Sequence, residues 1–163
     1  MKTLLLLRHG KSSWDDPELE DHERPLKPRG QKYAKRIGRW LRDSGLKIDL
    51  VLCSTAVRAR ETWELVAESF KKAPAVEYLD ELYHCPLDRF ATVLNRLPAK
   101  VRTVLLVGHN PGLEDLLAKL RGEQESFPTG ALAKLTCPIK SWTEFETDLP
   151  CTLEALVRPR ELQ

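Results

Sequence analysis

Short and almost uninterrupted apolar runs recur along the chain, and each ends abruptly at polar or glycine residues. The clearest runs cover residues 3–7, 49–54 and 101–107. A strand buried on both faces of a sheet has this continuous apolar character, because neither side of it meets water. The pattern therefore predicts three central strands. A weaker run predicts a further strand over residues 75–78. Two more runs, over residues 132–136 and 153–157, predict closing strands whose order and direction the pattern leaves open.

The segments between these runs have apolar residues at helical spacing. From Gly30 onward, Tyr33, Ile37 and Leu41 are separated by lysines and arginines, and a glycine at position 45 is a natural C-terminal stop. Similar spacing predicts three more helices, over residues 56–70, 87–97 and 113–120. Residues 15–29 differ, because they are densely charged and contain three prolines, which predicts a long exposed loop.

This alternation of strands and helices predicts an α/β fold, in which helices cover both faces of a mostly parallel sheet. In such folds ligands bind at the carboxyl ends of the strands. A chain of 163 residues that is 42% apolar can bury one sizeable core and is short for two. We therefore expect a single domain over residues 1–163.

Composition narrows the possible functions. The chain has 26 lysines and arginines against 24 acidic residues, so no overall charge favours a nucleic acid or a membrane surface as partner. The first apolar run is too short for a signal sequence or a membrane span. The four cysteines form no C-x-x-C pair, and a chain of this length needs no disulfide framework. No heptad pattern is visible. We expect a cytoplasmic monomer with reduced thiols.

The first strand is followed by a tripeptide suited to phosphate chemistry, Arg8-His9-Gly10. A histidine attacks a phosphoryl group when one ring nitrogen is unprotonated, a partner holds the other, and nearby cations stabilise the equatorial oxygens. Arg8 offers a planar fork for bidentate phosphate contact. Gly10 lets the backbone turn sharply and approach a ligand. The tripeptide thus supplies a nucleophile, a clamp and a turn.

Two other strand ends add matching groups. Arg58 lies one turn into the helix that follows the second strand, near a helix N-terminus that itself favours anions. His109 follows the strand over residues 101–107 and adds a hydrogen-bond donor or a second cation. Two histidines and two arginines around one tetrahedral anion suit phosphoryl transfer.

Three motifs occur in a fixed order: LRHG at residues 7–10, STAVRARET at 54–62 and VGHNPG at 107–112. Together they resemble the motifs of the histidine phosphatase superfamily, the phosphoglycerate mutase-like group. The short length, Arg24-Pro25-Leu26 followed by a glycine, and Glu81-Leu82-Tyr83 ahead of the last motif resemble the SixA branch of phosphohistidine phosphatases. The likeness covers most of the chain.

The resemblance implies a fold, an activity and a set of site residues. The fold is a three-layer α/β/α sandwich. The activity is hydrolysis of a protein phosphohistidine, or of a small phosphomonoester, through phosphorylated His9. The resemblance further implies that Arg8, Arg58 and His109 form the phosphate pocket and that Arg24 is an added substrate contact. It implies no metal and no organic cofactor.

The sequence departs from the family pattern in places. Thr55 stands where many relatives have proline, and Glu61 where glutamine is common; neither changes the proposed phosphate ligands. Many members place a glutamate between the arginine motif and the second histidine to protonate the leaving oxygen, whereas the SixA branch lacks an obvious equivalent. Glu81 is the one candidate acid in the corresponding stretch. An imidazole leaving group needs such an acid less than an alkoxide does.

Two other functions fit parts of the pattern. A mutase would move phosphate between hydroxyls through the same phosphohistidine, but it needs a closed pocket. Mutases of this group resemble the core with extra insertions and a C-terminal tail, and a chain of this length has little room for either. A phosphate-binding module would keep the fold without the chemistry, but it would be expected to lose the nucleophile. We therefore expect a phosphatase that acts on a phosphorylated protein or a small phosphorylated metabolite.

Several of these residues also have plainer interpretations. Arg24 could be a solvated loop residue tied to Asp21 and Glu23. The histidine at position 22 lies among charges and is expected to be exposed. His84 has no partner at metal-binding spacing, so we predict no metal site. The four tryptophans are dispersed, which favours core or loop anchors over a base-stacking surface.

Overall fold

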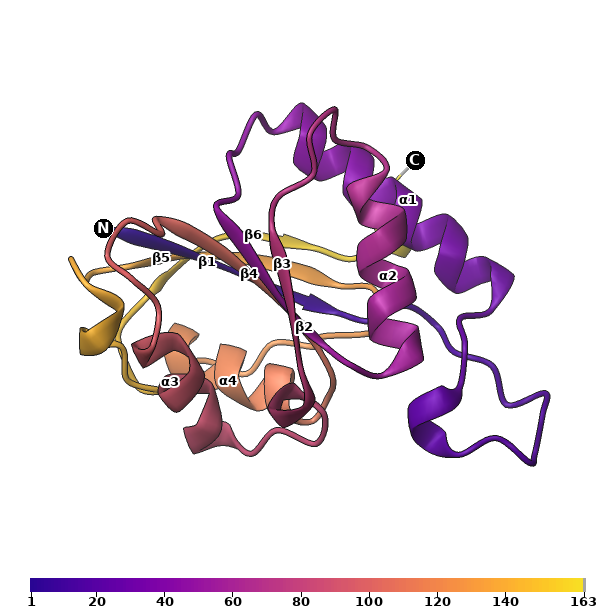
Figure 1. Cartoon of the computed structure of the whole chain (residues 1–163). Coiled ribbons are helices and arrows are strands. Elements are labelled where there is room, and N and C mark those ends of the chain that lie inside the picture. The colour runs from indigo at the N-terminus through magenta and orange to yellow at the C-terminus, as the bar shows by residue number, and fades with distance from the viewer. Residues whose placement is uncertain (163) are drawn as a thin grey trace.

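The computed structural model describes residues 1–162 and is built on one six-stranded sheet (Figure 1). Its strands are β1 (Lys2–Arg8), β2 (Leu50–Ser54), β3 (Val76–Leu79), β4 (Thr103–Gly108), β5 (Leu132–Cys137) and β6 (Thr152–Val157). They lie in the order β3-β2-β4-β1-β5-β6. The first four strands are parallel to one another, whereas the β1–β5 and β5–β6 pairs are antiparallel. This settles the order and direction that the sequence left open.

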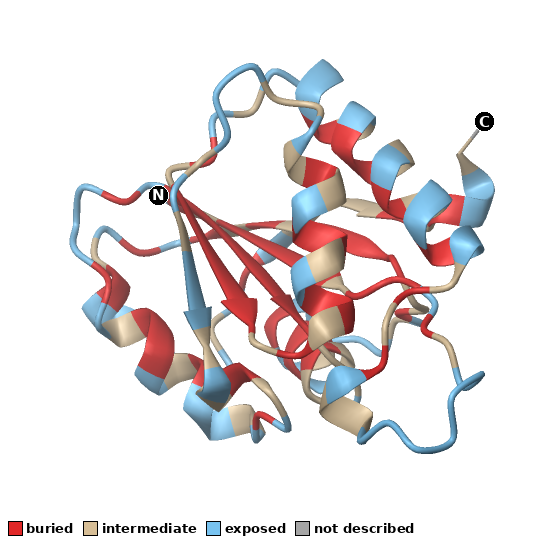
Figure 2. Cartoon of the chain, turned by 45° about the vertical axis from the view of Figure 1, so that its right-hand side comes forward, coloured by how far each residue is buried: buried red, intermediate tan, exposed pale blue. Residues whose placement is uncertain are grey.

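Helices cover both faces of the sheet, which confirms the predicted α/β fold (Figure 1). They are α1 (Pro28–Asp43) and α2 (Val57–Ala67) on one face, and α3 (Leu87–Asn95) and α4 (Gly112–Arg121) on the other. Within β1, Leu5 and Leu7 pack toward α1 and α2, whereas Leu4 and Leu6 pack toward α3 and α4. All four leucines are buried, which explains why this strand is apolar on both faces (Figure 2).

The element boundaries differ from the predicted ones by up to three residues. α1 begins at Pro28, two residues before the predicted start, because a proline in the first helical turn sacrifices no hydrogen bond. α2 ends at Ala67 rather than at residue 70, since the N–H groups of Ser69 and Phe70 bond three residues back, to Val66 and Ala67, and form a turn. Within residues 1–162, none of the helices combines the length and apolar character needed to cross a bilayer.

The carboxyl ends of β1, β2 and β4 lie next to one another. Arg8 at the end of β1 is in register with Gly108 at the end of β4, and Cys53 of β2 is in register with Val107. One residue beyond β1, the N–H of His9 still donates to the carbonyl of Gly108 at 3.1 Å. The three sequence motifs therefore meet at one edge of the sheet, as the pattern of the strands predicted.

The segment between β1 and α1 folds back on itself. Ser12 and Leu26 pair in an isolated antiparallel bridge, and a short 3-10 helix, η1 (Asp21–Glu23), lies in the outer part of the segment. Most of that outer part is exposed, as predicted (Figure 2). The inner part is not, because Ser12, Arg24 and Leu26 are buried. The loop is therefore a fixed wall beside the end of β1.

Two glycines let this loop and the start of α1 approach each other closely. A Cβ atom on Gly10 would lie 2.9 Å from the carbonyl oxygen of Gly30, and one on Gly30 would lie 2.4 Å from the carbonyl oxygen of Lys11. Both contacts are with backbone, which cannot move aside as a side chain can. The N–H of Lys27 also donates to the Lys11 carbonyl at 2.8 Å. The first turn of α1 is thereby fixed against residues 9–11.

Two of the four cysteines are neighbours in the fold although they are far apart in the sequence. Cys137 ends β5 and Cys151 precedes β6, and their Sγ atoms lie 3.3 Å apart in the buried core. All four cysteines are free thiols. The pair fills the space between two antiparallel strands as small apolar side chains do.

Candidate active site

A cavity of about 280 Å³ lies where β1, β2 and β4 end. Side chains from all three motifs and from the loop after β1 line it: Arg8, His9, Lys11, Ser12, Trp14, Arg24, Arg58, His84, His109, Asn110 and Thr129. Five of the residues predicted for the site are among them. The structure thus brings together Arg8, His9, Arg24, Arg58 and His109.

His9 is held in one tautomer by the backbone. Its Nδ1 atom lies 2.7 Å from the carbonyl oxygen of Gly10, and because a carbonyl only accepts, Nδ1 carries the proton. Nε2 is then left with its lone pair. Gly10 is itself fixed, since its N–H donates to the hydroxyl of Thr62 in α2 at 3.0 Å.

His9 is also kept uncharged. Only 7% of the residue is exposed, and this burial lowers the pKa of His9 to about 3, with further lowering by the positive charges of Arg58, Arg8 and Arg24. The hydrogen bond to Gly10 acts in the opposite direction but is outweighed. At neutral pH the ring therefore presents an unprotonated nitrogen, which a nucleophile requires.

His109 faces His9 and is oriented by a serine. The two ring centroids lie 5.0 Å apart, and the Nε2 atom of His109 is 2.7 Å from the hydroxyl of buried Ser54. That hydroxyl accepts the N–H of Ala56 at 3.2 Å, and within the described residues Nε2 of His109 is the one acceptor for its own proton. The remaining nitrogen, Nδ1, then carries a proton. Burial lowers the pKa of His109, and the positive charge of Arg58 lowers it further, so His109 acts as a neutral donor rather than a second cation.

Two buried donors at the site have no partner within the described residues. One is Nδ1 of His109 and the other is Nε of Arg8. An unpaired buried donor costs about 1–3 kcal/mol, so such groups are rare unless a ligand completes them. The rest of Arg8 is anchored, since its Nη1 atom donates to the carbonyl of Phe127 at 3.3 Å. The pair of free donors is suited to the oxygens of an anion.

Asp21 connects two arginines of the site. Its Oδ1 atom accepts from Nη1 of Arg24 at 2.9 Å, and its Oδ2 atom accepts from Nη2 of Arg58 at 2.9 Å. Arg58 also donates to the carbonyl of Asp21 at 2.6 Å, and Tyr83 donates its hydroxyl proton to Oδ2 at 2.5 Å. A single carboxylate therefore aims both guanidinium groups at the cavity.

The same contacts keep Asp21 ionised. Burial raises its pKa, but the hydrogen bonds from Tyr83, Arg58 and Arg24 outweigh that effect and hold the pKa of Asp21 well below its usual range. Asp21 is thus a fixed carboxylate and no source of protons. The sequence indicates Asp21 only as an ion-pair partner of Arg24. Its spacing three residues before that arginine was the one available signal.

Arg24 is a buried cavity residue, so the alternative of a solvated loop side chain was wrong in its exposure, although the expected pairing with Asp21 is present. Only 6% of it is exposed, and besides Asp21 it donates to the Ser13 carbonyl at 2.9 Å and the Ser12 hydroxyl at 2.6 Å. Its guanidinium carbon lies 3.3 Å from the centre of the Trp14 ring. Trp14 itself is 72% exposed, so it covers Arg24 from the solvent side as a loop anchor.

Of the two other histidines, only His84 lines this cavity. His22 was expected to be exposed, but its Nε2 atom contacts the hydroxyl of Thr55 at 3.0 Å and its ring packs edge-on against Tyr83. His84 lines the mouth of the cavity and packs against the same tyrosine. Its backbone has a φ of 53°, a conformation that a residue other than glycine adopts rarely. Within residues 1–162, no group of three or more His, Cys, Asp or Glu side chains is placed to hold a metal ion.

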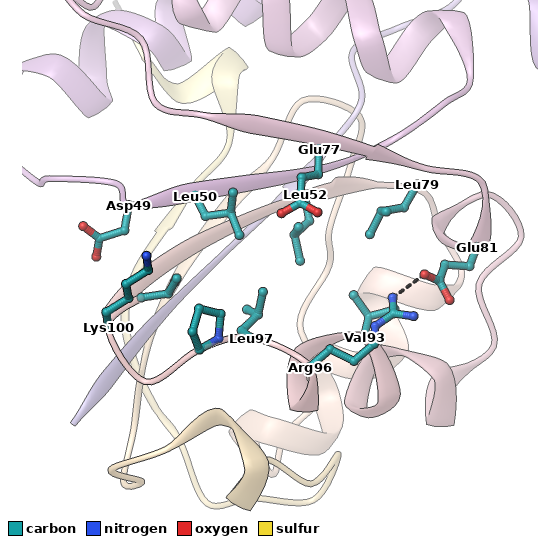
Figure 3. A pocket seen from close by; sticks show the side chains of 12 residues that line it. Asp49, Leu50, Leu52, Glu77, Leu79, Glu81, Val93, Arg96, Leu97 and Lys100 are labelled. Carbon is teal, nitrogen blue, oxygen red and sulfur yellow. Dashed lines mark hydrogen bonds and ion pairs between the residues drawn. The ribbon is translucent and has the colours of Figure 1, made fainter.

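Glu81, the candidate acid, is not brought to this site. It lines a different cavity of about 550 Å³, beside β3, where it forms an ion pair with Arg96 (Figure 3). The residues that line the cavity around His9, taken from the described part of the chain, include no aspartate or glutamate. This lining therefore offers no carboxylic acid next to His9.

A sequence profile of the histidine phosphatase superfamily (branch 1) matches residues 4–87, which contain the first two motifs. The chain belongs to the histidine phosphatase superfamily. Within this superfamily, the chain is 30% identical to phosphohistidine phosphatase SixA of Escherichia coli. The match covers 93% of the present chain and 96% of SixA. It is also 39% identical to an uncharacterized protein of Mycobacterium tuberculosis, over 79% of this chain and 85% of that one.

A solved structure supports the same branch. The protein histidine phosphatase SixA complexed with tungstate superposes with a TM-score of 0.83 at 27% identity, over 99% of both chains. The present chain therefore has the three-layer fold of the SixA-type branch.

The neutral state of His9 predicts a particular pH dependence. The value of kcat/KM for p-nitrophenyl phosphate, corrected for the second ionisation of the ester near about pH 6, should stay within about twofold between pH 7.5 and 5. An ordinary histidine nucleophile with a pKa of about 6.5 would instead lose roughly tenfold by about pH 5.5. A corrected profile that falls with an apparent pKa near 6.5 would contradict the buried, cation-surrounded state of His9.

Asp21 is predicted to act by orienting the two arginines. Asp21→Asn should lower kcat/KM by about ten- to a hundredfold, because misplaced phosphate ligands stabilise the transition state poorly. Steady-state kinetics of the variant test this, with Asp43→Asn as the control, since within residues 1–162 Asp43 forms its one ion pair with exposed Arg42. Unchanged or higher activity in Asp21→Asn would mean that this carboxylate competes with phosphate for the arginines.

Proposed function

We propose that this member of the histidine phosphatase superfamily hydrolyses phosphohistidine on a protein, through an intermediate phosphorylated at Nε2 of His9. The observation that carries the proposal is the state of that nitrogen. It is unprotonated, and it lies in a cavity that three arginines and two further histidines line. Two unpaired donors there can bond to phosphate oxygens. Nucleophile and charge stabilisation are therefore already in place.

The reaction takes two displacements. The lone pair of His9 Nε2 attacks phosphorus, a nitrogen–phosphorus bond forms, and the bond to the substrate imidazole breaks with its electron pair leaving on that nitrogen. Arg8, Arg58 and the Nδ1–H of His109 hold the equatorial oxygens during this transfer. A water molecule then attacks phosphorus, the bond to Nε2 breaks, and orthophosphate leaves. Gly10 keeps the proton on Nδ1 throughout, so His9 returns to its starting tautomer.

The choice of a phosphohistidine is supported by the missing acid. An alkoxide leaving group needs a proton donor, whereas an imidazole leaves more readily without one. No carboxylic acid within residues 1–162 lines the cavity. Similarity to phosphohistidine phosphatase SixA supports the same substrate class. A mutase is disfavoured, because the cavity mouth lies beside exposed Trp14 and exposed His84, where water reaches a phosphoenzyme.

The proposal is tested by release of orthophosphate from three substrates: a phosphohistidine protein domain, p-nitrophenyl phosphate and 3-phosphoglycerate. The expected order of kcat/KM follows the ease of the leaving group, with the phosphohistidine domain first and 3-phosphoglycerate at least about a hundredfold lower. His9→Ala should abolish all activity, whereas Glu81→Gln should keep it within about twofold, since Glu81 lies in another cavity.

Each outcome of that comparison decides something. Preference for 3-phosphoglycerate would reject phosphohistidine as the substrate. It would also mean that a dedicated acid protonates the leaving alkoxide. A large loss in Glu81→Gln would mean that Glu81 reaches the leaving group after all. Activity that survives in His9→Ala would overturn the mechanism itself.

A further inference from the structure

A second, smaller cavity of about 90 Å³ adjoins the catalytic cavity. Lys11 and Thr129 line both cavities, so the two are immediate neighbours. The other lining residues come from α1 and from the C-terminal part of the chain: Arg29, Tyr33, Pro128, Arg158, Pro159 and Arg160. Four of these eight residues are cations, and none is acidic.

The backbone fixes this cavity beside the nucleophile. Arg29 lies in the first turn of α1, which the close approach of Gly10 and Gly30 holds against residues 9–11. On the other side, the N–H of Gly130 donates to the carbonyl of His9 at 2.9 Å. A Cβ atom on Gly130 would lie only 3.0 Å from Pro159, the first residue of the short helix η4 (Pro159–Glu161). Both walls of the small cavity are therefore packed against the end of β1.

The positive charge in this cavity is largely uncompensated. Arg158 is neutralised, since it lies 3.8 Å from Glu125 and 3.7 Å from Glu161. Lys11, Arg29 and Arg160 form no ion pair within residues 1–162. Because the whole chain carries a net charge of only +2, this concentration of cations is local. Cations gathered in a concave site attract an anionic ligand group.

The size of the cavity limits what it can hold. A volume of about 90 Å³ corresponds to roughly three water molecules at about 30 Å³ each. That is room for one carboxylate or phosphate group. Lys11 reaches both cavities, so an anion in the small cavity lies next to a phosphoryl group at His9.

We propose that this small cavity binds a second anionic group of the substrate, a carboxylate or a phosphate, while the phosphoryl group lies at His9. The inference rests on the proposed function and deepens it, because it defines the substrate as carrying two neighbouring anionic groups. The second group is either an acidic residue near the phosphohistidine of a protein or a second acidic group of a small phosphorylated molecule.

Binding measurements test the subsite without requiring catalysis. The probes are methylphosphonate, which has one anionic group, and phosphonoacetate, 3-phosphonopropionate and 4-phosphonobutyrate, which add a carboxylate at increasing distance. Calorimetry at low ionic strength should show that wild type binds at least one carboxylate probe more tightly than methylphosphonate. Arg29→Gln/Arg160→Gln should raise the Kd of that probe by about five- to twentyfold and the Kd of methylphosphonate by less than about twofold.

The matched control is Arg39→Gln/Arg89→Gln. It removes two exposed arginines that line neither cavity and form no ion pair within the described residues. This control should bind all probes like wild type. The subsite is rejected if the wild-type protein binds no carboxylate probe more tightly than methylphosphonate. It is also rejected if both double variants raise the Kd of every probe equally, as a general loss of positive charge would do. Arg160→Gln alone repeats the test should the double variant unfold early.

Kinetics with two substrate pairs distinguish the source of the second anion. One pair is a phosphohistidine peptide with glutamate or glutamine beside the phosphohistidine; the other is 1,3-propanediol bisphosphate and propyl phosphate. In the pair that represents the true substrate class, the doubly anionic substrate should have the lower KM with the wild-type enzyme. With Arg29→Gln/Arg160→Gln the two KM values of that pair should become equal, while kcat stays unchanged. Wild-type inactivity on all four substrates would reject the proposed phosphatase function, whereas equal KM values within both pairs would reject the subsite alone.

Discussion

The hydrogen bond between His9 Nδ1 and the carbonyl of Gly10, 2.7 Å long, is the contact on which the site depends. It places the ring proton on Nδ1 and leaves Nε2 as the only nucleophilic nitrogen. Gly10 is held in place for this contact, because it lies against the backbone of Gly30 and donates to Thr62 in α2. The state of one nitrogen is thus set by the packing of the helix layer on the sheet.

The cations around that nitrogen raise a second physical problem, because like charges repel where water is scarce. Asp21 reduces this repulsion between Arg24 and Arg58, because its carboxylate accepts hydrogen bonds from both guanidinium groups. Tyr83 donates a further hydrogen bond to the same carboxylate. Arg8 is held from elsewhere, through the carbonyl of Phe127. The arginines are therefore oriented before substrate arrives, and little reorganisation remains when phosphate charge develops in the transition state.

The sequence predicted the strands, the helices and the meeting of the three motifs, because buried parallel strands have continuous apolar runs and their carboxyl ends share one edge. It did not predict what depends on side-chain direction in irregular segments. Asp21 lies in a 3-10 turn within a loop that reads as exposed, and Glu81 follows β3 but points into another cavity. Periodicity carries no information on either orientation, nor on the small cation-lined cavity, whose walls are distant in sequence.

The most direct test of this account is to trap the enzyme during turnover of p-nitrophenyl phosphate, by rapid quenching in alkali followed by peptide mapping in a mass spectrometer and by ³¹P and ¹⁵N NMR. The account predicts one phosphoryl group, on His9 and bonded to Nε2, that forms and decays at rates compatible with kcat. A phosphoryl group on Nδ1 of His9, on His84 or on His109, or steady turnover with no phosphorylated residue at any time, would contradict it.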